Sequence, residues 1–267
     1  MAFRRLLRGH VPWSHLESIT KAVMERYDLP EAEVTFLETD NWLSTPFVIN
    51  DKLFVKVVSA QNSMVHALLT AGRNLGAFSS GREGFFEHVG DPVQMAEHEL
   101  DATRRMRDLG VNAPEPLEAF EHEGLGVLVL EYLPEFRTLC DLDGEEVAEH
   151  AVELFALLSK MHDASLAHGD LRSENVLVSQ GELYFIDATS VREDGIADAR
   201  SYDLACALAV LAPLMGGREA VAAALEVYDE EELLAASEFL DFISMRPDHD
   251  FEVTGIRGEI EKRATST

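Results

Sequence analysis

Short apolar runs separated by polar turns mark the first half of the chain. They cover residues 34–39, 46–49, 53–58, 117–120 and 127–130. Short runs of this kind, bounded by turn residues, are typical of β-strands. We therefore expect these segments to form one small sheet.

Helical periodicity marks three longer stretches, at residues 14–28, 94–109 and 144–163. The first begins near a serine that can cap it and ends before Pro30, which suits a packing helix ahead of the sheet. The second stops at Gly110, a residue type that commonly follows a helix C-terminus. The third carries apolar residues along one side and is predicted to be amphipathic.

The last part of the chain is also predicted to be helical. Asp203 opens an apolar helix over 204–215, and further helices are expected at 218–228 and 230–244. Because Asp is a favoured N-cap, capping alone would explain Asp203. We interpret the remaining residues as a polar tail.

The chain is strongly acidic. Its 267 residues include 49 Asp and Glu against 22 Lys and Arg, for a formal net charge of −27. In dilute buffer the excess negative charges repel one another, whereas in about 1 M salt the interaction between exposed charges is screened over a distance of about 3 Å. We infer that the protein comes from the cytoplasm of a halophile. The alternative is an ordinary acidic protein with acidic partners. No basic surface for nucleic acid is expected.

The sequence also argues against a membrane or secreted protein. No window reaches the roughly 18 uncharged apolar residues of a spanning helix, and the N-terminus lacks the apolar centre of a signal peptide. Cys140 and Cys206 lack metal-site spacing, so neither a zinc site nor a disulfide framework is expected. We expect a soluble, cytoplasmic protein.

The strongest chemical pattern begins at His168. Asp170 and Asn175 share the polar turn His-Gly-Asp-Leu-Arg-Ser-Glu-Asn, and a later apolar run delivers Asp187 to the end of a strand. Phosphoryl transfer from ATP needs such groups, because the protein must orient a hydroxyl and hold Mg²⁺ against the phosphates. Asp170 would be the base, and Asn175 and Asp187 would be the oxygen ligands of Mg²⁺. A polar hairpin turn is the simpler alternative.

Lys56 stands alone in the apolar strand predicted at 53–58. Burying an ammonium group without a partner is costly, so we expect Lys56 to meet an anion. The alternative is a lysine whose stem is buried while its charge reaches solvent.

The order His-Gly-Asp-Leu-x-x-x-Asn followed by Ile-Asp resembles the catalytic and metal-binding loops of the protein-kinase-like superfamily. Within it the chain looks most like the atypical RIO-type kinases and the small kinase of the KEOPS complex. As in those families, a pair without glycine, Ala188-Thr189, follows the aspartate.

The resemblance implies an α+β, bilobal protein-kinase-like fold, with a small antiparallel-sheet N-lobe and a mainly helical C-lobe. It divides the chain into a helical extension at 1–30, an N-lobe at 31–131 with an insert at 59–93, and a C-lobe at 132–267.

The resemblance also assigns residues of the first lobe. Lys56 would meet the nucleotide phosphates and a helix glutamate. Glu99 is preferred to Glu97 as that partner, because its distance from the helix-ending glycine is the one found in RIO-like kinases. The backbone of Glu131 and Leu133 would pair with adenine.

In the second lobe, the resemblance makes Asp203 the aspartate that braces the catalytic loop from below, and capping of the helix that follows is the alternative.

Two loops carry further expectations. The turn at 40–45 contains no glycine, so the hydroxyls of Ser44 and Thr45 are expected to replace backbone N–H groups at the phosphates. The insert holds Ser79 and Ser80, which the resemblance makes candidates for self-phosphorylation. A loop with ordinary turn residues is the alternative.

We therefore expect an atypical Ser/Thr protein kinase that uses ATP and Mg²⁺ and acts on a protein, which can be the chain itself. One alternative is a small-molecule phosphotransferase of the aminoglycoside or choline class. Arg172-Ser173-Glu174 argues against it, whereas Tyr202-Asp203-Leu204-Ala205 is compatible with it. The second alternative is a nucleotide-binding scaffold or slow ATPase that switches a partner protein.

The charge generates the first testable prediction. If the excess of carboxylates is an adaptation to salt, the melting temperature should rise as salt increases from about 0.1 to about 3 M, because screening removes self-repulsion. Thermal melts across a salt series measure it. A melting temperature that does not respond to salt would contradict the halophile inference.

Overall fold

The computed structural model describes residues 11–37, 44–64, 70, 90–189, 195–246 and 248–265. The chain divides into two compact units, which we describe separately. The first comprises Met1–Gly72, His88–Arg104 and Pro114–Pro134, and the second comprises Arg73–Glu87, Arg105–Ala113 and Glu135–Thr267. The loop at 40–43 and the serines at 79 and 80 lie outside the described residues, so the expectations placed on them stay predictions, as do the predicted domain boundaries.

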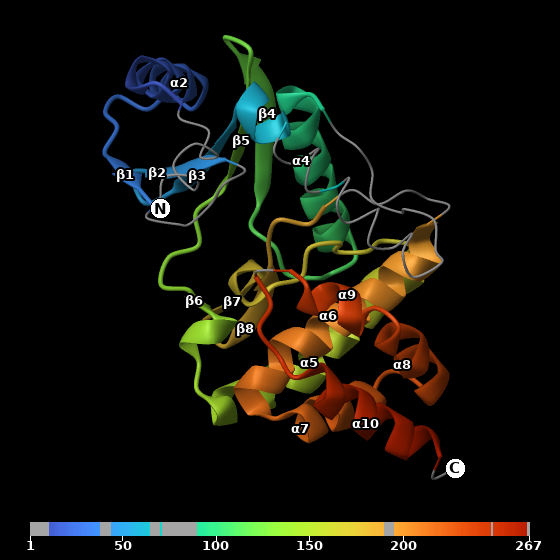
Figure 1. Ribbon diagram of the computed structural model, residues 1–267. Helices are drawn as coiled ribbons and strands as arrows, with labels where there is room; N and C mark the ends of the chain where they lie inside the picture. Colours follow the sequence, from blue (N-terminus) through green and yellow to red (C-terminus); the bar gives the residue numbers. More distant parts are fainter. Residues whose placement is uncertain are drawn as a thin grey trace. The chain divides into compact units, whose positions relative to one another are not determined.

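The first unit is built on an antiparallel sheet of five strands (Figure 1). Its strand order is β1, β2, β3, β5, β4. The strands are β1 (Val34–Phe36), β2 (Thr45–Ile49), β3 (Leu53–Val58), β4 (Pro116–His122) and β5 (Leu125–Glu131). The predicted sheet is therefore confirmed, and β3, which carries Lys56, lies at its centre.

Helix α2 (Trp13–Arg26) packs on one face of this sheet (Figure 1). Its buried residues Ile19 and Val23 join a core that includes Val127 and Val129 of β5. The predicted helix is thus confirmed as a packing element. It begins one residue earlier than expected, so Ser14 lies inside it and Pro12 stands at the cap position.

Helix α4 (Pro92–Asp108) covers the opposite face. Ala96 and Leu100 pack against Leu128 and Leu130, which alternate along β5 with the residues under α2. A β-carbon added at Gly126 would lie 2.0 Å from the Pro92 carbonyl oxygen. The start of α4 therefore depends on a glycine in the strand beneath it.

The second unit is mainly helical, with a small antiparallel sheet. The sheet has the order β6 (Arg137–Thr138), β7 (Val176–Ser179), β8 (Glu182–Phe185). The helices are α5 (Gly144–Asp163), α6 (Ile196–Met215), α7 (Gly217–Leu225), α8 (Glu230–Ser237), α9 (Leu240–Ser244) and α10 (Val253–Ala264). The two units together confirm the expected α+β class.

Helix α5 matches its predicted range, and α6 is the most deeply buried helix of the unit. The side chain of Asp143 caps α5 by accepting hydrogen bonds from the N–H groups of Glu145 and Glu146. Helix α6 is apolar on all sides over much of its length, which is typical of a helix surrounded by others.

Three predictions for the C-terminal part were wrong. Helix α6 begins at Ile196, so Asp203 lies inside it and is not its cap. The helix expected at 230–244 is divided into α8 and α9. The expected polar tail contains α10, because Ile256 and Ile260 are one turn apart and both are buried.

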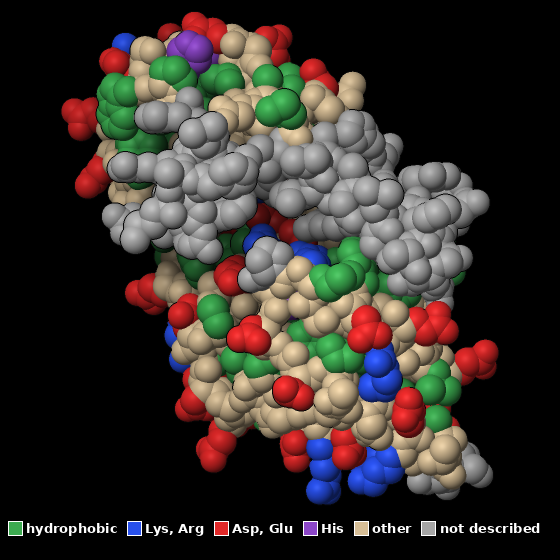
Figure 2. All heavy atoms as spheres, in the orientation of Figure 1, with side chains coloured by type: hydrophobic (Ala, Val, Ile, Leu, Met, Phe, Trp, Pro, Cys, Tyr) green, Lys and Arg blue, Asp and Glu red, His purple; other side chains and the backbone are tan. Residues whose placement is uncertain are grey.

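Acidic side chains are spread over the described surface of the face shown in Figure 2, and basic ones are fewer there. Among the described residues, no helix is both long enough and apolar enough to cross a membrane.

The contact at Gly126 generates a prediction. Gly126→Ala should lower the free energy of unfolding by about 1–3 kcal/mol, because the added methyl group must push away the backbone that begins α4. Urea unfolding of parent and variant measures the change.

Gly258 provides the matched control, because it is exposed on α10 and an added β-carbon would meet nothing within 4 Å. Gly258→Ala should stabilise the protein by about 0.5–1 kcal/mol through helix propensity. Equal effects of the two substitutions would refute the close approach of β5 and α4.

Candidate active site

The loop that begins at His168 is anchored by a buried carboxylate of α6. Asp203 is fully buried, and its two oxygens accept hydrogen bonds from the N–H groups of His168 at 2.6 Å and Gly169 at 2.8 Å. The His162 ring lies 3.3 Å from the same carboxylate and contacts the Tyr228 hydroxyl at 2.9 Å. A buried carboxylate requires such donors, so this one fixes the backbone just before Asp170.

His168 connects this loop to the segment that carries Asp187. The Asp170 N–H points at His168 Nδ1 at 3.4 Å, so Nδ1 is the unprotonated nitrogen and Nε2 donates to the Ile186 carbonyl at 3.0 Å. Burial lowers the pKa of His168, which keeps the ring neutral. The Thr189 N–H also donates to the His168 carbonyl at 2.7 Å. Asp187 therefore lies between two residues, Ile186 and Thr189, that are hydrogen-bonded to His168.

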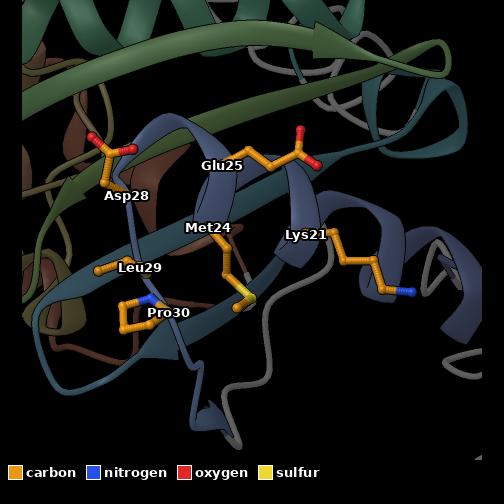
Figure 3. Close-up of a pocket in the computed structure, with 6 residues that line it drawn as sticks. All are labelled: Lys21, Met24, Glu25, Asp28, Leu29 and Pro30. Atoms are coloured by element: carbon orange, nitrogen blue, oxygen red, sulfur yellow. The ribbon is translucent and has the colours of Figure 1, made fainter.

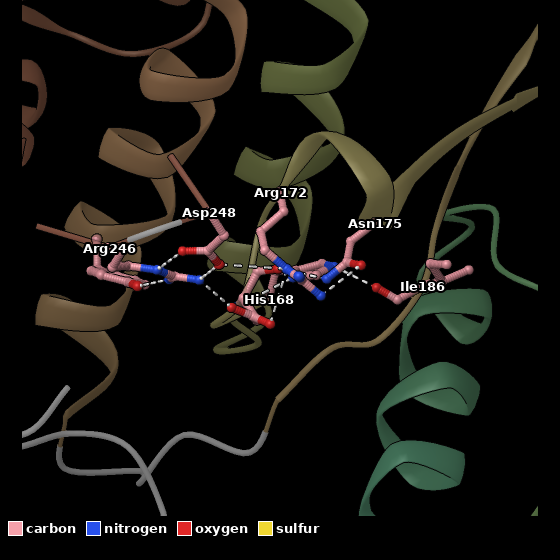
Figure 4. A network of polar contacts seen from close by, with 8 residues as sticks. His168, Arg172, Asn175, Ile186, Arg246 and Asp248 are labelled. Atoms are coloured by element: carbon pink, nitrogen blue, oxygen red, sulfur yellow. Dashed lines mark hydrogen bonds and ion pairs between the residues drawn. The ribbon is translucent and has the colours of Figure 1, made fainter. Parts of the chain in front are cut away.

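Asn175 completes this group. Its side-chain Nδ2 donates to the backbone carbonyl of Asp170 at 2.8 Å, and its backbone carbonyl accepts a hydrogen bond from the Ile186 N–H at 3.1 Å. The side-chain oxygen Oδ1 of Asn175, the predicted metal ligand, accepts a hydrogen bond from Arg172 at 3.3 Å (Figure 4). The structure thus brings Asp170 and Asn175 together, and Asp187 follows Ile186 in the left-handed region, with φ 60°.

The oxygen atoms of Asn175 and Asp187 fit Mg²⁺ chemically. No group of three or more His, Cys, Asp or Glu side chains among the described residues could hold a metal ion alone. Mg²⁺ commonly binds one or two protein oxygens and completes its shell with phosphates and water. The donor set therefore suits a metal ion that arrives with a nucleotide.

Two arginines flank the carboxylate of Asp170, which is 6% exposed. Arg246 donates to Oδ1 at 2.8 Å, and Arg172 Nε lies 3.4 Å from Oδ2. Arg246 follows α9 and is distant in sequence from the catalytic loop (Figure 4). The role of Arg246 cannot be read from the sequence, because a single arginine after a helix carries no local signal.

In the first unit, the structure brings Lys56 and Glu99 together. The Lys56 ammonium group lies 2.8 and 2.9 Å from the two carboxylate oxygens of Glu99. The side chains are only 9% and 14% exposed, so water screens this pair weakly. Glu97, the other candidate, is exposed.

Parts of the chain match known proteins. Residues 91–199 match the family model of the RIO domain. This part of the chain resembles the RIO domain. It is also 32% identical over 104 residues to the KEOPS complex subunit Bud32 of Pyrococcus abyssi, a match that covers 38% of the chain and 46% of that protein. The expected resemblance to RIO-type kinases and to the KEOPS complex is confirmed, and the chain spans less than half the length of the Bud32 protein that it matches.

A solved structure also resembles the chain. It is the GDP complex of wild-type aminoglycoside 2'-phosphotransferase-IIIa, with 11% sequence identity and a TM-score of 0.49. The alignment covers 94% of this chain and 99% of that one.

The remaining predicted binding residues belong to the first unit. Ser44 is buried just before β2, and its hydroxyl has no hydrogen-bond partner among the described residues. The Glu131 N–H donates to the Glu115 carbonyl at 2.9 Å, so this N–H is not available to adenine. Leu133 is half-buried in the following segment. The roles of these residues stay predictions.

A pocket of about 430 Å³ lies at the end of α2 (Figure 3). None of the predicted site residues lines it. The lining residues are Lys21, Met24, Glu25, Asp28, Leu29 and Pro30.

The contacts of Asp203 generate a prediction for the loop that begins at His168. Asp203→Asn should lower the free energy of unfolding by about 1–3 kcal/mol, because one of the two loop N–H groups then faces an amide NH₂ in a buried place. It should also lower phosphoryl transfer. Urea unfolding and a transfer assay measure the two effects.

Asp241→Asn is the matched control, because it removes the exposed ion pair with Arg257. Such a pair contributes about 0–1 kcal/mol. If Asp203→Asn is as mild as this control, the carboxylate does not anchor the loop.

Proposed function

We propose that the chain is an ATP- and Mg²⁺-dependent Ser/Thr protein kinase of RIO-like type, which transfers the γ-phosphoryl group to a hydroxyl. One observation carries the proposal. Asp170, Asn175 and the residues on both sides of Asp187 are joined by hydrogen bonds through His168 and the anchored loop. A base and two metal ligands held in one frame are what phosphoryl transfer requires of a protein.

Each side chain then has a role. Asp170 would orient the acceptor hydroxyl and take its proton. Asn175 and Asp187 would hold Mg²⁺, which neutralises phosphate charge when it is bound. Lys56, kept in place by Glu99, would bind the phosphates of the nucleotide.

The RIO domain match and the likeness to Bud32 support phosphoryl transfer more strongly than they support a particular acceptor. We propose a protein acceptor, with self-phosphorylation at Ser79 or Ser80 as one case, in a cytoplasm of high salt. A transfer assay with γ-labelled ATP and cell lysate at molar salt identifies the acceptor. Label in small molecules would indicate a small-molecule phosphotransferase, and phosphate release without any acceptor would indicate an ATPase.

The proposed roles predict that two aspartate variants fail in different ways. Asp187→Ala should weaken Mg²⁺-dependent nucleotide binding and abolish transfer, because it removes a metal ligand. Asp170→Ala should leave binding within a few fold and lower transfer by about 10²–10⁴, the usual effect of a positioned acid or base. Calorimetry measures binding and labelled phosphate measures transfer.

Lys56→Met extends this test to the first unit and should reduce both binding and transfer. Lys52→Met is its matched control, because Lys52 is an exposed lysine just before the same strand. The assignment of the base is wrong if Asp170→Ala transfers phosphate as fast as the parent.

A further inference from the structure

Arg246 is a buried cation whose hydrogen bonds end on the proposed base. The residue is 9% exposed and lies in the connection between α9 and α10, outside the RIO-like segment. Its Nη2 donates to Asp170 Oδ1 at 2.8 Å and also to Asp248, and its Nε donates to Asp248 at 2.9 Å. Its Nη1 donates to the Tyr202 hydroxyl. Every nitrogen of the guanidinium group is therefore engaged.

The partners of Arg246 are themselves fixed. Tyr202 is fully buried in α6 and packs edge-on against Phe239, with ring centroids 5.9 Å apart at 84°. The ring centroids of Tyr202 and Phe242 are 6.1 Å apart. Because Tyr202 cannot move without disturbing this core, the planar guanidinium group has one favoured position.

Asp248 shows how strongly Arg246 acts on nearby carboxylates. Burial alone would raise the pKa of Asp248, but the hydrogen bonds and positive charge of Arg246 outweigh burial and hold that pKa below its usual range. The same guanidinium group contacts Asp170. One arginine thus compensates two carboxylates that would otherwise repel each other.

We propose that Arg246 is a positioning residue for phosphoryl transfer, which holds the Asp170 carboxylate through Oδ1 in the orientation that receives the acceptor hydroxyl. The inference rests on the proposed function. It adds that Arg246 acts on the proposed base, although it lies 76 positions from Asp170 in sequence. A displaceable inhibitory strap fits the observations less well, because removing a buried guanidinium group from two carboxylates and a phenol is costly.

The competing explanation is that Arg246 only holds the α9–α10 connection in place. Two variants separate the explanations. Arg246→Gln breaks the bonds to both Asp170 and Asp248, whereas Asp248→Asn weakens the connection but keeps the bond to Asp170. A structural role predicts similar losses from both, and a positioning role predicts a loss of turnover from the first alone.

The expected results are specific. Arg246→Gln should lower kcat by about 10–100-fold, because a small misplacement of a reacting group has an effect of this size, and it should leave the KM for ATP within about threefold. Arg246→Lys, which keeps a cation near Oδ1, should recover part of kcat. Asp248→Asn should stay within about threefold of the parent. Arg257→Gln, which breaks an exposed ion pair of α10, is the matched control and should not change kcat.

Thermal melts of all variants show which are folded. If Arg246→Gln does not fold, Arg246→Lys is compared with Asp248→Asn instead. The proposal is overturned if the loss of kcat in Arg246→Lys is no larger than the loss in Asp248→Asn. Equal losses of kcat in Arg246→Gln and Asp248→Asn also overturn it, as does a loss confined to KM.

A double-mutant cycle separates this inference from the proposed function. The melting temperature of Arg246→Gln combined with Asp170→Asn should fall by less than the sum of the two single falls, because both remove the same contact. The cycle can be measured even if the parent transfers no phosphate, in which case the proposed function fails on its own. Additive falls would show that the Arg246–Asp170 contact is absent, and they overturn the inference.

Discussion

The carboxylate of Asp203 is the constraint on which the catalytic loop depends. A fully buried anion is tolerated only where hydrogen-bond donors surround it, and here two of those donors are consecutive backbone N–H groups of the loop. This contact fixes the peptide units before Asp170. From them, His168 reaches the Ile186 carbonyl and Asn175 reaches the Asp170 carbonyl. The rigidity of this loop thus comes from α6.

The same helix anchors a second network. Tyr202, next to Asp203 in α6, accepts a hydrogen bond from Arg246, and Arg246 in turn holds the Asp170 carboxylate. Neighbouring residues of one buried helix therefore support the proposed base in two ways, through the loop backbone and through the side chain. Because the polar groups of both networks satisfy one another, they can be buried among the apolar residues of the second unit.

Much of this architecture could be predicted from local patterns. Strand β3 and helix α5 match the expected residues 53–58 and 144–163, because period and turn signals there agree with the final packing. The Lys56–Glu99 contact was also expected: a lysine inside an apolar strand needs an anion, and the resemblance to RIO-type kinases indicated Glu99 as that anion. The expectation that residues after Ser244 form a polar tail failed, because the buried stripe of α10 consists of only two isoleucines among charged residues.

The contact of Arg246 with Asp170 could not be predicted from the sequence. The two residues are 76 positions apart, and nothing near Arg246 distinguishes it from an arginine on the surface. Only the packing of α9 against α6 brings it to the catalytic loop. The phosphate-binding role of Ser44 also stays a prediction, since it depends on the loop at 38–43, which lies outside the described residues.

The central claim is that Asn175 and Asp187 hold the metal ion of a bound nucleotide beside Asp170. A crystal structure with Mg²⁺ and a non-hydrolysable ATP analogue tests it most directly. The account predicts a metal ion at about 2.0–2.1 Å from Asn175 Oδ1 and from a carboxylate oxygen of Asp187, with the remaining ligands from phosphate and water. A bound nucleotide whose metal ion contacts neither residue would contradict the account.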